Sequence, residues 1–74
     1  MFGLGKKRSK FGKFLDRNGI SQQELSRESG VNRNSISRIA SDQDKSPSMK
    51  NANKIIKTLK EAGFKVDNDD FWSM

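Results

Sequence analysis

The stretch of the chain that decides the fold is ISQQELSRESGVNRNSISRI, from Ile20 to Ile39. Its pattern predicts two short helices joined by a glycine turn. Ser21 can cap the first helix, and Glu24 three residues later fits a Ser-x-x-Glu capping box. Gly30 supplies the positive φ that ends this helix, and Asn32 is a preferred N-cap residue for a second helix that begins at the next position.

The apolar residues of this stretch are few and regularly spaced: Ile20, Leu25, Val31, Ile36 and Ile39. If the two helices cross at a sharp angle, Leu25 faces the isoleucines of the second helix and Val31 fills the turn. The second helix then turns an acid-free polar face outward. The residues on that face are Arg33, Asn34, Ser37 and Arg38.

The same stretch resembles the helix-turn-helix of the lambda repressor and Cro family, also called the xenobiotic-response-element type. Its pattern reads roughly S-Q-x-x-L-A-x-x-x-G-V-s-x-x-x-I-s-x-I-E, and the resemblance extends from about Ser9 to Phe64. The matching residues are Ser21, Gln22, Leu25, Gly30, Val31, Ile36, Ser37 and Ile39. Ser26 stands where the family usually has Ala, and Ala40 stands where it usually has Glu. The serine is small enough to preserve close helix packing. The missing Glu affects only the usual way in which the second helix ends.

The resemblance implies that the second helix enters the major groove of double-stranded DNA and that its first residues, and one a turn later, meet base edges. Arg can bond bidentately to guanine and Asn to adenine. The predicted base-contacting residues are Asn32, Arg33, Asn34, Ser37 and Arg38. The alternative is an ordinary solvated helix face, and the capped helix ahead and the missing acids favour the DNA interpretation.

Phosphate contacts are predicted at two kinds of position. The first is the start of the first motif helix, where free N–H groups favour an anion and where the resemblance gives the Gln a phosphate bond. The second is the set of basic side chains before the first helix and around Pro47, each of which could equally be plain solvated surface. The predicted residues are Ser21, Gln22, Lys6, Lys7, Arg8, Lys10, Lys45 and Lys50.

Composition and charge agree with a polyanionic partner. The chain has 74 residues, a formal net charge of +6 and no Cys or His. Bases gather before Asp16 and acids gather after Val66, so only one end suits phosphate. No disulfide framework is possible without Cys, and the commonest general base is missing. No phosphate-cradling glycine motif, catalytic pair or metal-ligand spacing appears, so we expect no enzymatic activity, cofactor or metal. No apolar run is long enough to span a membrane.

The remaining segments predict an all-α bundle of four helices, with a fifth short helix or an ordered tail at the C-terminal end. We expect a flexible N-terminal arm at 1–6, a helix-turn-helix domain at 7–66 and an acidic, aromatic tail at 67–74. The first helix should run from about Lys7 to Asn18, carrying an apolar stripe of Phe11, Phe14 and Leu15. Gly12 within it should cost about 1 kcal/mol relative to Ala.

After a loop around Pro47, Ser48 should cap a helix that ends near Ala62. Its predicted inner face consists of Met49, Ala52, Ile55, Ile56, Leu59 and Ala62. Its predicted outer face consists of Lys50, Lys54, Lys57 and Lys60. Phe64 and Val66 alternate with polar residues in a strand-like pattern. We expect Phe71 or Trp72 to pack on the core or on a second subunit, and the indole has no evident partner within the chain.

The sequence thus predicts a small transcriptional regulator that binds double-stranded DNA sequence-specifically, as a cytoplasmic, nucleoid-associated repressor of phage or mobile-element type. Two copies on a palindromic operator are expected because one small domain makes few contacts. One alternative is an antitoxin-like or anti-repressor-like module that binds a protein partner through Phe71 and Trp72. Another is a cationic membrane-active peptide, suggested by the basic, apolar N-terminal stretch.

Overall fold

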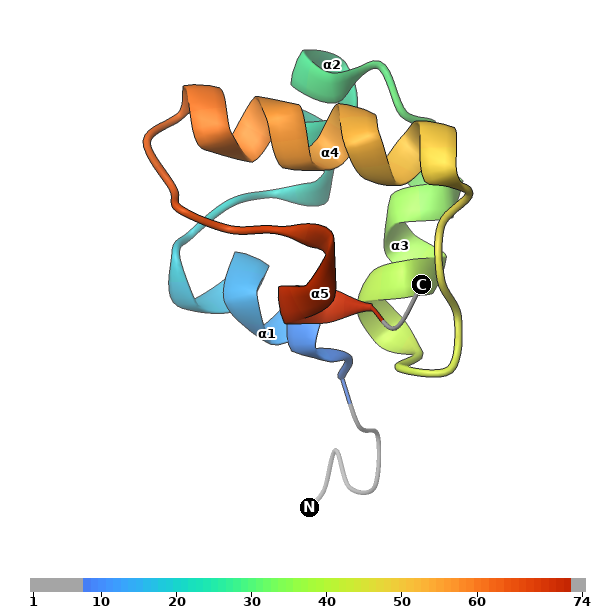
Figure 1. The fold of residues 1–74 in the computed structure, drawn as a ribbon. Helices are drawn as coiled ribbons and strands as arrows, with labels where there is room; N and C mark the ends of the chain where they lie inside the picture. The colour runs from blue at the N-terminus through green and yellow to red at the C-terminus, as the bar shows by residue number, and fades with distance from the viewer. Residues whose placement is uncertain (1–7, 73–74) are drawn as a thin grey trace.

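Five helices and no strand make up residues 8–72, the part of the chain that the computed structural model describes (Figure 1). They are α1 (Lys10–Arg17), α2 (Gln22–Ser29), α3 (Arg33–Ser41), α4 (Met49–Glu61) and α5 (Asn68–Phe71). The all-α prediction is confirmed. The expected arm at 1–6, which includes Lys6, lies outside the described residues. Lys7 lies outside them as well.

The helix ends around the central turn lie where the sequence places them. Ser21 accepts the backbone N–H of Glu24 at 3.0 Å, and Asn32 accepts that of Asn34 at 2.7 Å. Gly30 caps the C-terminus of α2 with a φ of 79°. The Glu24 carboxylate lies 3.5 Å from the Ser21 hydroxyl. Glu24 thus takes part in the expected capping box through a contact between the two side chains.

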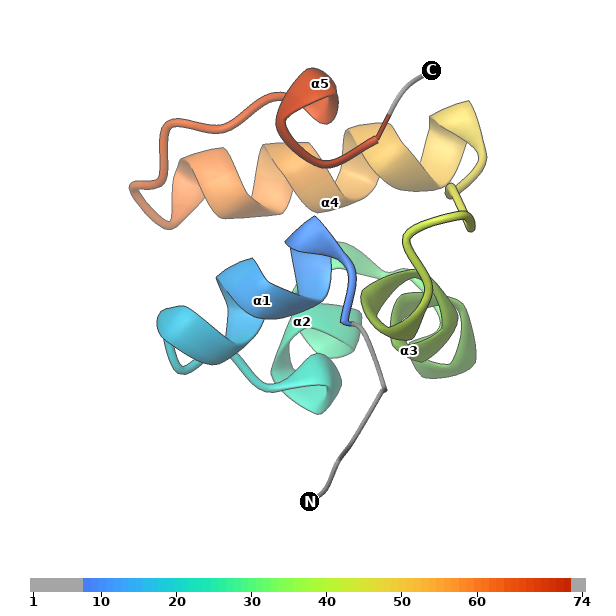
Figure 2. The same cartoon turned by 90° about the horizontal axis from the view of Figure 1, so that it is seen from below.

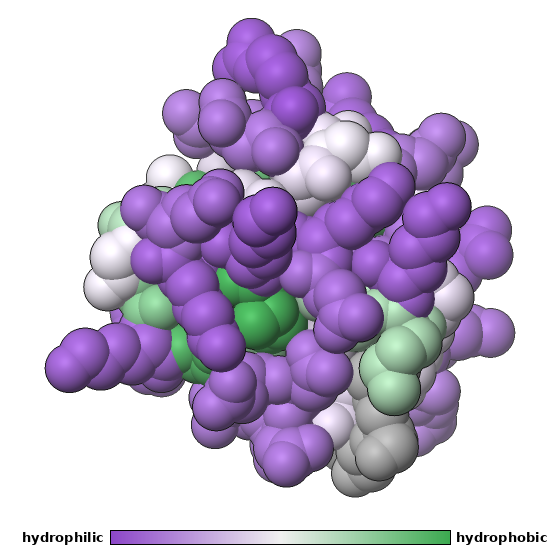
Figure 3. All heavy atoms as spheres, turned by 45° about the horizontal axis from the view of Figure 1, so that its top comes forward, coloured by the Kyte–Doolittle hydropathy of each residue, from purple (hydrophilic) through white to green (hydrophobic). Residues whose placement is uncertain are grey.

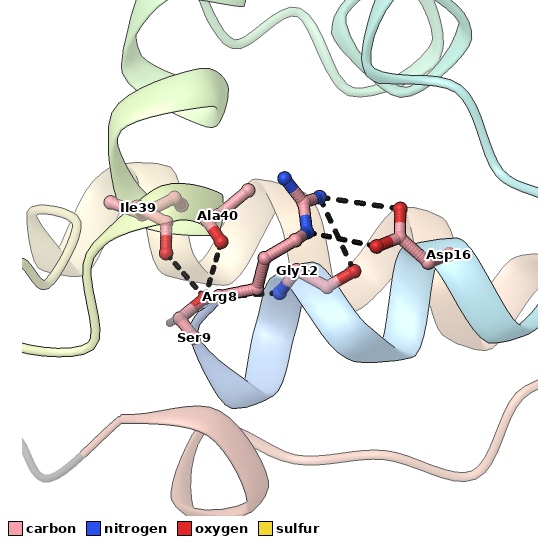
Figure 4. Close-up of polar contacts among 6 residues, drawn as sticks. All are labelled: Arg8, Ser9, Gly12, Asp16, Ile39 and Ala40. Atoms are coloured by element: carbon pink, nitrogen blue, oxygen red, sulfur yellow. Dashed lines mark hydrogen bonds and ion pairs between the residues drawn. The ribbon is translucent and has the colours of Figure 1, made fainter. Parts of the chain in front are cut away.

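The first helix begins at Lys10 rather than near Lys7 as predicted, because Ser9 caps it (Figure 4). The buried Ser9 hydroxyl accepts the backbone N–H of Gly12 at 3.0 Å. It also lies 2.7 Å from the carbonyl of Ile39 and 3.0 Å from that of Ala40. These carbonyls belong to the last turn of α3, where they lack helical partners. One side chain therefore caps the start of α1 and the end of α3 together.

Gly12 has a role that helix propensity does not reveal. A Cβ atom at this position would lie 2.1 Å from the carbonyl oxygen of Ala40, far inside van der Waals contact. The α1 and α3 backbones can approach this closely only because Gly12 has no side chain. Ala40 itself is fully buried, which explains why the longer, charged Glu of the family pattern is missing here.

One core unites all five helices. Its residues are Phe11, Leu15, Leu25, Val31, Ile36, Ile39, Ala40, Ala52, Ile55, Ile56, Leu59, Phe71 and Trp72. The inner face of α4 is confirmed at its centre and wrong at its ends, since Met49 is 60% exposed and Ala62 is an exposed C-cap residue. The four lysines of the outer face are exposed as predicted.

The C-terminal segment corrects two expectations. Phe64 and Val66 are half-buried against the core but form no strand. Phe71 and Trp72 are 5% and 3% exposed, and both rings pack on Phe11, with centroids 5.4 and 5.3 Å apart. The indole thus has partners within the chain, and the two aromatic side chains do not form the predicted surface for a protein partner.

Gln43, in the loop before α4, ties α5 to the start of α1. Its side-chain oxygen accepts the backbone N–H of Lys10 at 2.7 Å, and its amide donates to the carbonyl of Phe71 at 3.1 Å.

In Figure 2, α4 and α5 lie together on one side of the molecule, and α2 and α3 lie on the other. The two helices of the motif are therefore turned away from the C-terminal segment.

Gly12→Ala should destabilise the protein although Ala is the better helix former. The new methyl group would meet the Ala40 carbonyl, and overpacking of this kind costs about 1–3 kcal/mol, more than the ~1 kcal/mol that helix propensity returns. Urea unfolding measures the difference. Lys13→Ala, at an exposed position of the same helix, should change little, and a stabilised Gly12→Ala would contradict the close α1–α3 approach.

Phe71→Ala should lower the free energy of unfolding by about 3–5 kcal/mol, because it empties a packed aromatic site. Trp72 fluorescence can follow the unfolding, and Asp69→Ala on the exposed side of α5 is the control. Equal unfolding midpoints for the two variants would show that α5 lies outside the cooperative core.

Candidate nucleic-acid interface

Two serine hydroxyls of α2 fix the turn that leads into α3. Ser26 donates to the carbonyl of Val31 at 2.7 Å, so the residue that replaces the usual Ala adds a bond across the turn. Ser29 donates to the Leu25 carbonyl at 2.6 Å and accepts the backbone N–H of Val31 at 3.2 Å. Leu25 and Val31 are buried beneath these bonds. The turn is therefore fixed from both its polar and its apolar side.

The outward face of α3 is polar and basic, as predicted. Arg33, Asn34 and Arg38 are exposed, and Ser37 is half-buried. Asn32 is exposed too, although its side-chain oxygen is engaged in capping. The opposite side of the helix carries the buried Ile36 and Ile39. Because these side chains are already exposed, they can donate hydrogen bonds to a ligand without any change in the packing of the core.

No carboxylate neutralises this face within residues 8–72. The ion pairs there are Arg8–Asp16 at 2.8 Å and Lys60–Asp67 at 3.2 Å, and neither involves Arg33 or Arg38. The acids of the C-terminal segment are engaged around α5, where the backbone N–H of Asp67 donates to Asp70 at 2.8 Å. Since α5 packs against α1 and α4, the acidic segment does not cover α3 (Figure 2).

A hollow of about 230 Å³ lies between α3 and the start of α4. Its lining consists of Val31, Ser35, Arg38, Ile39, Lys45, Ser46, Pro47, Ser48 and Asn51. The hollow brings together two bases from the predicted site, Arg38 and Lys45, beside a helix start whose first turn has no acid. Bases next to a helix N-terminus attract anionic groups such as phosphate.

Comparison with known proteins agrees with this geometry. A family model described as helix-turn-helix matches residues 13–62, which is more than half of the chain. The chain belongs to the lambda repressor/Cro-type helix-turn-helix family. It is thus a DNA-binding protein of the transcription-regulator class, and the family is not one of enzymes. Searches of curated proteins and of solved structures return no match to this chain.

Across residues 8–72, no cluster of three His, Cys, Asp or Glu side chains could hold a metal ion. In the same part of the chain, no helix is both long and apolar enough to cross a bilayer.

The predicted phosphate contacts are spread over the surface. Lys10, Lys45 and Lys50 are exposed, and Lys6 and Lys7 lie outside the described residues. Arg8 forms an ion pair with Asp16 along α1 (Figure 4). Ion pairs between exposed side chains contribute little free energy. At the start of α2, Gln22 is half-buried and the Ser21 hydroxyl is engaged in capping. These phosphate contacts remain predictions.

Sequence reasoning missed several polar side chains beside the motif. Ser35, Ser46 and Asn51 share the hollow with Arg38 and Lys45. Ser35 carried a usable signal, since it lies in the same acid-free helix as the residues that were selected. Ser46 and Asn51 carried none, because only the folding of the loop around Pro47 brings them near α3.

Substitution by Ala should affect the stability of the protein differently at Asn32 and at Asn34. Asn32→Ala removes the cap of α3 and should cost about 0.5–2 kcal/mol of stability. Asn34→Ala should cost little, because its exposed side chain makes no hydrogen bond within residues 8–72. Thermal unfolding of both variants tests this, and equal losses of stability would contradict the capping role of Asn32.

Proposed function

We propose that the protein is a sequence-specific repressor of phage or mobile-element type, acting in the cytoplasm on nucleoid DNA. The observation that carries this proposal is the exposed face of α3, where Arg33 and Arg38 have no carboxylate partner within residues 8–72. Repression is the simpler regulatory outcome, because occupying a promoter is enough to block transcription, whereas activation needs a further productive contact.

Binding has two components in this proposal. Lysines and helix N-termini hold phosphates without reading sequence, and the side chains from Asn32 to Arg38 read base edges in the major groove. One domain of this size makes few contacts, so two copies bind a palindromic operator with half-sites about 34 Å apart. The hollow beside α3 supports this division, since Arg38 and Lys45 share its lining.

The two alternatives lose their main support. The protein-binding module was to contact its partner through Phe71 and Trp72, beside the acids of the tail, and both side chains are buried. The membrane-active peptide depended on a basic, apolar N-terminal stretch, of which Phe11 is fully buried in the core and Phe14 packs against it.

Selection of bound duplexes from a random pool identifies the operator, and a palindromic consensus is the expected result. Arg38→Ala should then weaken operator binding by roughly 5- to 150-fold, which corresponds to the 1–3 kcal/mol of one base contact, and should leave non-specific binding nearly unchanged. Titrations of operator and scrambled duplex at the same salt concentration measure both affinities.

Lys50→Ala is the matched comparison, because a phosphate contact carries no sequence information. It should weaken binding to both duplexes by the same factor and reduce the salt slope by about one. Lys57→Ala, on the outer face of α4, should change neither affinity. If Arg38→Ala weakened operator and scrambled duplex equally, Arg38 would not read bases.

A further inference from the structure

An open apolar groove lies between α2 and the C-terminal half of α4, away from the outward face of α3. Its volume is about 350 Å³. The apolar part is formed by Ile20, Leu25, Leu59, Ala62 and Phe64. Figure 3, which brings the side of α2 and α4 forward, shows an apolar patch enclosed by hydrophilic side chains. Leu25 and Leu59 form a buried floor, whereas Ile20 and Phe64 are half-buried and Ala62 is exposed.

The rim of this groove is acidic in a basic protein. Glu24, Glu28 and Glu61 are the three glutamates of the chain, and all of them line the groove. None of its lining residues is Lys or Arg, although the chain has 15 of these. Such a rim repels phosphate and attracts cations. An occupant that suits the groove combines apolar side chains with positive charge.

We propose that this groove binds the N-terminal segment Met1–Lys7 of a second copy of the chain. This segment reads MFGLGKK and combines three apolar side chains with two lysines and no acid. In an extended chain Phe2 and Leu4 project to the same side and would meet the apolar floor. Lys6 and Lys7 would then lie near the glutamates of the rim.

A second copy fits better than the segment's own chain. Ser9 is fixed to the end of α3, because its backbone N–H donates to the Ala40 carbonyl at 3.1 Å. Ile20, which lines the groove, follows the other end of α1, and the eight residues of that helix span about 12 Å. The five residue steps from Leu4 to Ser9 cover at most about 18 Å, so running back along α1 to the groove of the same chain would use most of that reach. Two copies can exchange segments in a symmetric pair without this constraint.

The association should be weak, because two short segments bury much less than the roughly 1,600 Å² of a standard interface. Nuclear magnetic resonance on concentrated full-length protein suits such a complex. Since the chain has no Cys, Gly5→Cys provides a unique site for a nitroxide label. Spin-labelled chains without isotope are mixed with ¹⁵N-labelled wild-type chains, so that any signal loss reports contact between two copies.

The expected result is loss of most amide signal intensity at Ile20, Leu25 and Leu59, with Arg33 and Asn34 unaffected. Glu24→Gln/Glu28→Gln/Glu61→Gln in the ¹⁵N-labelled chain should restore the intensity. The control variant Asp44→Asn/Asp69→Asn removes two acids elsewhere and should not restore it. A label at Ser46→Cys, in the loop on the other side of the molecule, should leave the groove signals intact.

Three outcomes would overturn the proposal. The mixed sample could show no loss, or uniform loss at all exposed amides, which indicates random collisions. The loss could also occur only when label and isotope are on the same chain, which indicates docking within one molecule. The experiment contains no DNA and the inference does not depend on DNA binding, so each of these outcomes leaves the proposed function standing.

Discussion

The contact between the start of α1 and the end of α3 is the constraint on which the rest of the structure depends. Ser9 satisfies the carbonyls of Ile39 and Ala40 with its hydroxyl and backbone N–H, and Gly12 lets the two backbones approach within a distance that no side chain would allow (Figure 4). Because buried backbone carbonyls must be paired, the two helices cannot separate without losing hydrogen bonds. The C-terminal end of α3 is therefore fixed to the core.

The N-terminal end of that helix is fixed independently, by the turn. Ser26 donates to the Val31 carbonyl and Asn32 caps the first turn of α3. A helix held at both ends presents its outward side chains at one orientation, and preorganisation of this kind reduces the conformational entropy lost on binding. The backbone of α3 therefore needs no further ordering when a ligand binds, whereas exposed side chains such as Arg33 and Arg38 would still lose rotamer freedom.

The sequence was informative wherever a local rule decided the structure. The caps at Ser21, Asn32 and Ser48 and the left-handed Gly30 depend on neighbouring backbone groups, so residue type and spacing were enough to predict them. The exposed face of α3 followed from periodicity in the same way. How that face would contact DNA came from the family resemblance and not from spacing.

Where distant segments meet, the sequence was a poor guide. Gly12 looked like a weakness of α1 because its partner, Ala40, lies on another helix. Trp72 looked unpartnered because Phe11 and Phe71 come together with it only after α5 folds back. Gln43 gave no signal, although its amide joins the loop before α4 to both α1 and α5. In each case the deciding neighbour is remote along the chain, and no periodic pattern records it.

The separation of charge follows from the same arrangement. Apolar side chains fill the interior, so acids and bases must share a small surface, and their places are set by which helix faces remain outside. The acids near the C-terminus lie around α5, and the glutamates line the groove between α2 and α4. The outward face of α3 is left acid-free, and Arg33 and Arg38 keep their charge unneutralised within residues 8–72. Exposed lysines also lie on other faces, four of them on the outer face of α4, so the missing acids rather than a concentration of bases distinguish the outward face of α3.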